Sequence, residues 1–254
     1  MKWDEYIYTR PVFYKLIMNL FLKQSFFIVI IFISLSSLAQ KRISASVEIK
    51  QVKNKKVITI KKDIFYQSNG NFVVHMTKPQ EYYVVTNSLG EAKAYMPQTN
   101  EVLIINDPFF SSQNELLYSF LSNDFQDFGL QKIGFKLKSQ KKEGTKIIKT
   151  FITDKKEIKD ISKIEMVYEK NLPIYSAYYK QKEITRKIYY NKYMHFKMFT
   201  FPTQITEISY DSPSDSTVKR EVYSNIKVDE FIKNSLFDYK IPASAKLVSP
   251  FSKK

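Results

Sequence analysis

The stretch that decides the fold runs from Ile43 to Ile60 and reads ISASVEIKQVKNKKVITI. In its first half apolar and polar side chains alternate, which is the pattern of a β-strand with one buried face. The alternating apolar residues are Ile43, Ala45, Val47 and Ile49. The lysine-rich sequence KNKK at 53–56 suits a turn, and Val57–Ile60 continues as a second strand. The stretch therefore predicts an antiparallel hairpin.

Outward from this hairpin, short segments rich in β-branched and aromatic residues recur along most of the chain, separated by short polar turns. The further predicted strands are 72–76, 82–85, 92–95, 102–105, 134–138, 146–151, 161–168, 174–179, 184–190, 204–210 and 218–226. Connections this short join antiparallel neighbours. The sequence therefore predicts one long meander of strands in a single domain over residues 40–254.

One segment, Phe109–Leu121, interrupts the strand pattern and predicts a short apolar helix. Ser111 or Ser112 supplies a side chain that can cap the start of a helix. The large apolar side chains of the segment are candidate ligand contacts, and they are Phe109, Phe110, Leu116, Leu117, Phe120 and Leu121. Exposed on a soluble protein they would form an aggregation-prone patch, so we expect them to turn inward as a lid or plug. A second short helix is expected at 228–236.

A meander of this length hides its edge strands by closing on itself or by packing against another layer. We therefore expect a mainly β fold, namely a half-open antiparallel β-barrel of about eleven strands with one or two short helices as lid or plug. A barrel of that size is wider than its own side chains fill. It therefore either holds a ligand or is plugged, and a composition with 15% aromatic residues suits an apolar cavity as well as a packed core.

The N-terminal region has the three parts of a secretory signal peptide. Lys23 precedes the apolar run Phe26–Leu38, and the small residues Ser37 and Ala39 occupy the −3 and −1 positions for cleavage before Gln40. Residues 1–39 are therefore left out of the predicted domain, and Met18 opens a more typical signal peptide than the first methionine does. The alternative is an uncleaved membrane anchor, in which Val12–Leu22 lengthens the apolar run toward the roughly 20 residues that a span needs. Lys15, Lys23 and Gln24 interrupt that longer stretch.

The composition excludes several classes of site. Five glycines cannot form a glycine-rich nucleotide loop, and a chain without cysteine has no disulfide, thiolate zinc site or cysteine nucleophile. Two histidines, His75 and His195, leave little for metal or acid–base chemistry. We therefore expect neither an enzyme nor a bound metal or cofactor. The net charge of the full sequence is +15, and with the expected export it favours anionic lipids or an acidic protein as partners over nucleic acid.

Four short motifs follow one another along the chain. They are GNFVVHMTKPQEYY at Gly70–Tyr83, AYMPQTNEV at Ala94–Val102, FPTQI at Phe201–Ile205 and FDYKIPASA at Phe237–Ala245. In this order, with the export segment and the apolar helix, they resemble the LolA-like family of periplasmic lipoprotein carriers.

The resemblance implies a half-open barrel that shields the acyl chains of lipoproteins, or of another lipid, while they cross the periplasm of a Gram-negative bacterium. It implies a monomer that receives its cargo from an inner-membrane releasing complex and passes it to an outer-membrane acceptor. It also implies a lid contact at Lys78 and Pro79, where the family has an arginine before a proline.

Two other classes of protein remain open at this point. The same fold implies, as an alternative function, a lipid- or peptide-sensing module of an envelope-stress regulator. An integral outer-membrane barrel also has alternating strands behind a signal peptide. The many lysines within the predicted strands argue against strands that face lipid.

Overall fold

The structure is a computed structural model that describes residues 42–107, 111–112, 116–122, 124–154, 161–196, 199–212, 215–228 and 232–248. All of these residues belong to one compact unit, Lys41–Lys254. The expected signal peptide at 1–39 and the candidate ligand contacts Phe109 and Phe110 lie outside the described residues. Across the described part of the chain, no helix has both the length and the apolar character that a membrane span requires.

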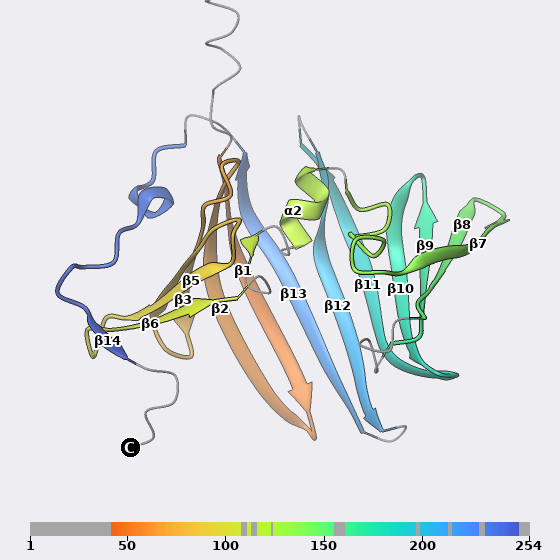
Figure 1. Cartoon of the computed structure of the whole chain (residues 1–254), viewed down its shortest axis with the longest axis horizontal. Coiled ribbons are helices and arrows are strands. Elements are labelled where there is room, and N and C mark those ends of the chain that lie inside the picture. Colours follow the sequence, from red (N-terminus) through yellow and green to blue (C-terminus); the bar gives the residue numbers. More distant parts are fainter. Residues whose placement is uncertain are drawn as a thin grey trace, which may run out of the picture. The chain divides into compact units, whose positions relative to one another are not determined.

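Strands account for most of the described residues (Figure 1). Six strands come first: β1 (Arg42–Lys53), β2 (Lys56–Gln67), β3 (Phe72–Lys78), β4 (Tyr82–Thr86), β5 (Glu91–Met96) and β6 (Glu101–Asn106). The helix α2 (Leu116–Leu121) follows. Seven more strands come next: β7 (Lys136–Glu143), β8 (Lys146–Ile152), β9 (Lys163–Glu169), β10 (Leu172–Lys180), β11 (Glu183–His195), β12 (Thr200–Ser212) and β13 (Asp215–Val228). The 3₁₀ turn η3 (Ser235–Asp238) and the short strand β14 (Lys246–Val248) complete the order.

The strands form one sheet of 14 strands in the order β14-β6-β5-β4-β3-β2-β1-β13-β12-β11-β10-β9-β8-β7. Apart from the edge strand β14, each half of the sheet is a meander of sequence neighbours, and β1 joins the halves because it pairs with β2 on one side and β13 on the other. Among the described residues the edge strands β14 and β7 do not pair with each other, so the sheet is open. The prediction of a mainly β, half-open antiparallel architecture is confirmed.

Two details of the predicted fold differ from the structure. The sheet has 14 strands rather than about eleven, in part because β14 has only three residues and no alternating pattern; it pairs in parallel with β6 and covers that edge. The prediction of a helix at 228–236 is wrong for the described residues of that range. Strand β13 extends to Val228, and the Asn234 side chain accepts the Leu236 N–H at 2.9 Å, which starts only the short turn η3.

Different segments cover the two faces of the sheet. The face on which α2 packs is termed the inner face, and it carries Ile43 and Val47 of β1. The opposite, outer face is covered near β2 and β3 by the C-terminal segment. There the Phe237 ring packs edge-on against Phe65, with 5.4 Å between ring centroids. The helix therefore has the inner face of the central strands as its packing partner.

Candidate functional site

Helix α2 buries the side that the sequence marks as apolar. Leu117 is 6% exposed and Phe120 is 0% exposed. Because they are three residues apart on the helix, both side chains project toward the sheet. Leu116 and Leu121 are partly buried beside them. The helix thus presents a continuous apolar surface to the inner face.

Phe120 is the centre of an aromatic cluster between α2 and the sheet. Its ring centroid lies 5.1 Å from that of Phe125, in the segment after the helix, and 5.4 Å from that of Phe201 on β12. Phe201 in turn packs edge-on against Tyr223 of β13 at 4.9 Å. Rings at these separations and angles attract one another beyond the effect of buried area. Ring packing therefore fixes α2 at this point.

The floor beneath α2 consists of buried aliphatic residues from adjacent strands. They are Ile43, Ala45, Val47, Ile49, Ile64 and Val74. At the edge of this floor the ring of Tyr66 faces Tyr118 of α2, with centroids 6.4 Å apart. Burial raises the pKa of Tyr66 to about 12, so its phenol stays neutral at neutral pH. The floor is therefore apolar and the aromatic ring at its edge uncharged.

Two serines before α2 tie the start of this region to neighbouring turns. The Ser112 hydroxyl donates to the Gly70 carbonyl at 2.7 Å, and the Ser112 N–H donates to the Asn87 carbonyl at 3.0 Å. The Ser111 hydroxyl donates to the Ser88 carbonyl at 2.9 Å. Ser112 is fully buried, so these bonds position the chain just before the helix on the β2–β3 and β4–β5 turns.

The inner face changes character directly beside the apolar floor. Glu221 lies opposite Ile49 in the register of β1 and β13. The ammonium of Lys219 lies 3.1 Å from one oxygen of Glu221 and 3.4 Å from one oxygen of Glu207. Burial by itself would lower the pKa of Lys219, but the two carboxylates outweigh it and raise that pKa. A charged, hydrogen-bonded cluster of three side chains therefore borders the floor.

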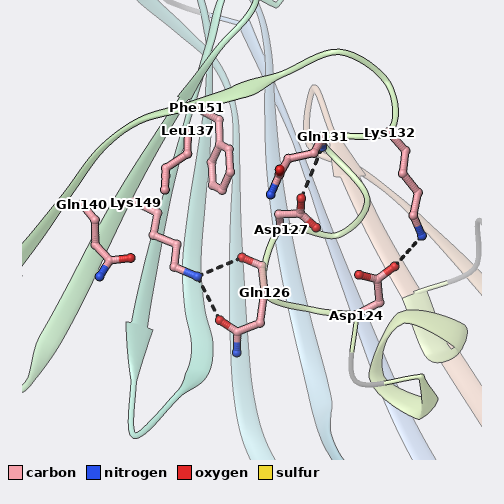
Figure 2. A pocket seen from close by; sticks show the side chains of 9 residues that line it. All are labelled: Asp124, Gln126, Asp127, Gln131, Lys132, Leu137, Gln140, Lys149 and Phe151. Carbon is pink, nitrogen blue, oxygen red and sulfur yellow. Dashed lines mark hydrogen bonds and ion pairs between the residues drawn. The ribbon is translucent and has the colours of Figure 1, made fainter.

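A pocket of about 330 Å³ lies between the segment after α2 and the strands β7 and β8 (Figure 2). It is lined by Asp124, Gln126, Asp127, Gln131, Lys132, Leu137, Gln140, Lys149 and Phe151. Its charged groups already have partners within the protein. Lys132 is paired with Asp124 at 2.8 Å, Lys149 donates to the Gln126 side chain at 2.9 Å, and Asp127 accepts two backbone N–H groups of its own turn. Burial lowers the pKa of Lys149.

Comparisons with known proteins place this geometry in a known fold. No family model matches the chain, and no curated protein matches it. A LolA superfamily protein from Nitrosomonas europaea has a similar structure, with a TM-score of 0.52 and 12% identity over 77% of this chain and 89% of that chain. An outer membrane lipoprotein-sorting protein domain from Vibrio parahaemolyticus has a TM-score of 0.53 and 13% identity over 78% of this chain and 89% of that chain.

The chain has a LolA-like fold. A DUF1329 family protein from Desulfovibrio piger shares it, with a TM-score of 0.51 and 16% identity over 78% of this chain and 89% of that chain. The resemblance inferred from the four sequence motifs is thus confirmed at the level of the fold.

The LolA-like sheet brings part of the predicted site together. Leu116, Leu117, Phe120 and Leu121 lie on α2 over the inner face, as described above. Lys78 and Pro79 are exposed at the end of β3. Lys78 lies opposite Lys61 in the register of β2 and β3, and Lys61 pairs with Glu48 on the outer face. By register, Lys78 is therefore on the face away from α2.

Sequence reasoning missed two features beside the LolA-like floor. The first is the segment 124–135, whose aromatic and leucine side chains pack on the sheet from the same side as α2; they are Phe125, Phe128, Leu130 and Phe135. The apolar recurrence in DFQDFGLQKIGF is a signal that could have found it. The second is the cluster of Lys219 with Glu207 and Glu221, for which charged residues at alternate positions of two adjoining strands are the signal. Within the described part of the chain, no group of three or more His, Cys, Asp or Glu side chains could hold a metal ion.

Proposed function

We propose that this chain is a carrier that binds acyl chains of lipoproteins, or of another lipid, between α2 and the inner face of its sheet. The observation that supports this most directly is the burial of Leu117 and Phe120 against an apolar floor by a single short helix. The aliphatic floor and the ring of Tyr66 at its edge offer contacts to hydrocarbon and no charge. The helix is thus the part of the fold whose contacts a lipid chain would replace.

A simple comparison of free energies favours such an exchange. Burying a large apolar side chain stabilises the folded state by about 1.5–3 kcal/mol, and burying one methylene by about 0.8 kcal/mol. Displacing Leu117 and Phe120 from the floor therefore costs about as much as burying four to eight methylenes of an acyl chain contributes. A lipid with longer chains has a surplus, whereas a short fatty acid does not. The proposed carrier would accordingly prefer long-chain lipids.

The polar groups around the floor give a bound lipid an orientation. The pocket of about 330 Å³ begins at Asp124, soon after α2 ends at Leu121, and its exposed lining includes the amides of Gln126 and Gln131. In the proposed complex, the acyl chain lies under α2 and the polar end of the lipid faces this pocket. The cluster around Lys219 then borders the hydrocarbon on another side.

The proposed place of action is the periplasm, to which the segment 1–39 would direct the chain as a cleaved signal peptide. The lipoprotein-sorting description of the Vibrio parahaemolyticus domain with the same fold supports this setting. In it, a monomeric carrier would receive lipid at the inner membrane and deliver it toward an acceptor in the outer membrane. Such binding requires neither a catalytic residue nor a cofactor.

The experiment that tests this function is native mass spectrometry of the exported protein, purified without detergent, with identification of the extracted lipids. We expect a stoichiometric diacyl or triacyl species. The matched variant is Leu117→Asp with Phe120→Asp, which places carboxylates in the proposed hydrocarbon site and should abolish the adduct. Protein that carries no lipid, and takes none up from vesicles, contradicts the proposal. Retention of a peptide or a regulator in place of lipid favours the sensing module.

A further inference from the structure

The hairpin of β1 and β2 ends in a tip whose side chains the fold leaves unburied. The strands run to Lys53 and from Lys56, and the two turn residues Asn54 and Lys55 both have positive φ, 49° and 63°. This is the backbone of a tight two-residue hairpin turn. The tip lies where β1 and β2 meet in the hairpin turn, at the ends of these strands that are farther from α2 (Figure 1). We define the tip as residues 52–58.

Three large apolar side chains of the tip are exposed, which is unusual for neighbours on one hairpin. Val52 is 38% exposed, Val57 63% and Ile58 52%. Val52 and Val57 are a cross-strand pair on the outer face, whereas Ile58 lies opposite Gln51 on the inner face. Apolar groups therefore lie on both faces of the hairpin end, which pairs with β13 along β1, instead of forming one flat patch.

The same tip is strongly basic. Lys53, Lys55 and Lys56 are all exposed. Lys53 is held by Asp211 at 2.7 Å and lies 4.0 Å from Asp215. Within the described part of the chain, no ion pair involves Lys55 or Lys56. Two uncompensated cations thus lie directly beside Val57 and Ile58.

A second basic hairpin, formed by β7 and β8, shows what a solvated lysine turn looks like in this protein. Lys141, Lys142 and Lys146 are exposed there as well. The residues next to that turn include no exposed large apolar side chain, since Ile147 and Ile148 are half-buried. Basic charge is therefore shared by both hairpins, but its combination with exposed aliphatic residues at the turn belongs to the β1–β2 tip.

We propose that the β1–β2 tip docks on the surface of an anionic lipid bilayer. Lys55 and Lys56 would contact lipid phosphates, while Val57, Ile58 and Val52 enter the boundary between head groups and acyl chains. Such a boundary accepts basic groups around an apolar wedge. An acidic protein would match the charge but would cover one side of the hairpin. The apolar residues on both sides of the tip therefore favour the bilayer. This inference concerns a surface remote from α2 and does not depend on what α2 binds.

The test measures partition of the purified protein onto phosphatidylcholine vesicles with and without phosphatidylglycerol, with every variant in the same processed form. We expect binding to the anionic vesicles alone, and weaker binding when added salt shortens the Debye length from about 10 Å to about 3 Å. Lys55→Asn with Lys56→Gln should weaken partition by about fivefold per lysine. Val57→Thr with Ile58→Thr, which keeps the β-branched shape, should weaken it several-fold.

The matched control is Lys141→Gln with Lys142→Gln on the β7–β8 hairpin, which removes the same charge and should leave partition nearly unchanged. An equal loss in this control would show that only net charge matters and would overturn the proposal. Absence of binding to anionic vesicles, or binding indifferent to the tip variants, would overturn it too. Unchanged melting temperatures show that the variants fold. Unchanged lipid content by native mass spectrometry separates this result from the carrier function.

Discussion

The hydroxyl of Ser112 donates a hydrogen bond to the carbonyl of Gly70 at 2.7 Å, in a fully buried position. This bond joins the chain just before α2 to the turn between β2 and β3, 42 residues earlier in the sequence. The segment before the helix is thus held to the turn that leads into β3 by a buried polar contact. Buried bonds of this kind are costly to leave half made, because the remaining partner has no water to replace the lost one.

Replacing Ser112 by alanine therefore tests how the start of the helix region is held. We expect Ser112→Ala to lower the free energy of unfolding by about 1–3 kcal/mol, since it leaves the Gly70 carbonyl without its side-chain donor. Urea denaturation measures this loss. The matched control is Ser122→Ala, which removes an exposed hydroxyl bond to the Tyr118 carbonyl and should cost less than about 0.5 kcal/mol. Equal effects of the two substitutions would contradict the role given to burial.

The turn at Gly70 allows a second test, because its backbone and its surroundings both favour glycine. Its φ is +87°, and a Cβ added there would lie 2.8 Å from the Cβ of Ser88. Gly129 has a φ of +74° but open space around it. We expect Gly129→Ala to cost about 1–2 kcal/mol from backbone strain alone, and Gly70→Ala to cost clearly more. Thermal unfolding of both variants measures the difference. A smaller effect at Gly70 would show that the turn shifts to make room for the added methyl group.

The part of the fold that could be predicted from sequence is the part set by near neighbours. The alternation at Ile43 and Val47 predicted a strand with one buried face because period-two burial is a local property. The helical spacing of Leu117 and Phe120 predicted the buried side of α2 for the same reason. In both cases a few adjacent residues carry the whole pattern.

Contacts between distant segments could not be predicted. The pairing of Ile43 with Val228 joins the two halves of the sheet, and no local pattern specifies it. The face of Lys78 depends on an irregularity in the register of β2 and β3 between Lys61 and Lys62. An extra residue in one strand changes which side chains share a face. The lid contact at Lys78 therefore rests on the resemblance alone. The register instead places Lys78 on the outer face, away from α2.

The cluster of Lys219 with Glu207 and Glu221 gives a prediction about charge and pH. Lys219→Met leaves two partly buried carboxylates without the cation they share, so we expect a loss of about 1–2 kcal/mol at neutral pH, less than for a fully buried pair. Because its folded-state pKa is raised above 10.5, the contribution of Lys219 is complete below that pH and is lost as the pH rises through the folded pKa. Denaturation curves between neutral and alkaline pH measure this loss.

The control for this charge is Lys132→Met, which removes a cation 77% exposed in its pair with Asp124. It should cost clearly less than Lys219→Met at neutral pH, because solvent screens an exposed pair. A loss that is the same at every pH would mean that Lys219 stabilises the sheet through its alkyl chain instead of its charge.

The last prediction concerns displacement of α2 by lipid, and hydrogen exchange measures it directly. In this structure the N–H of Ser122 donates to the Tyr118 carbonyl at 2.9 Å, and that of Asp124 to the Ser119 carbonyl at 2.8 Å. Both amides report on the helix, because opening the helix breaks both bonds. If a lipid chain takes the place of Leu117 and Phe120, we expect these two amides to exchange about tenfold faster or more in the loaded protein. The amide of Met166 in β9, away from α2, should be unchanged. Equal protection of Ser122 and Asp124 with and without bound lipid would identify α2 as ordinary core, and the proposed site would then lie elsewhere on the sheet.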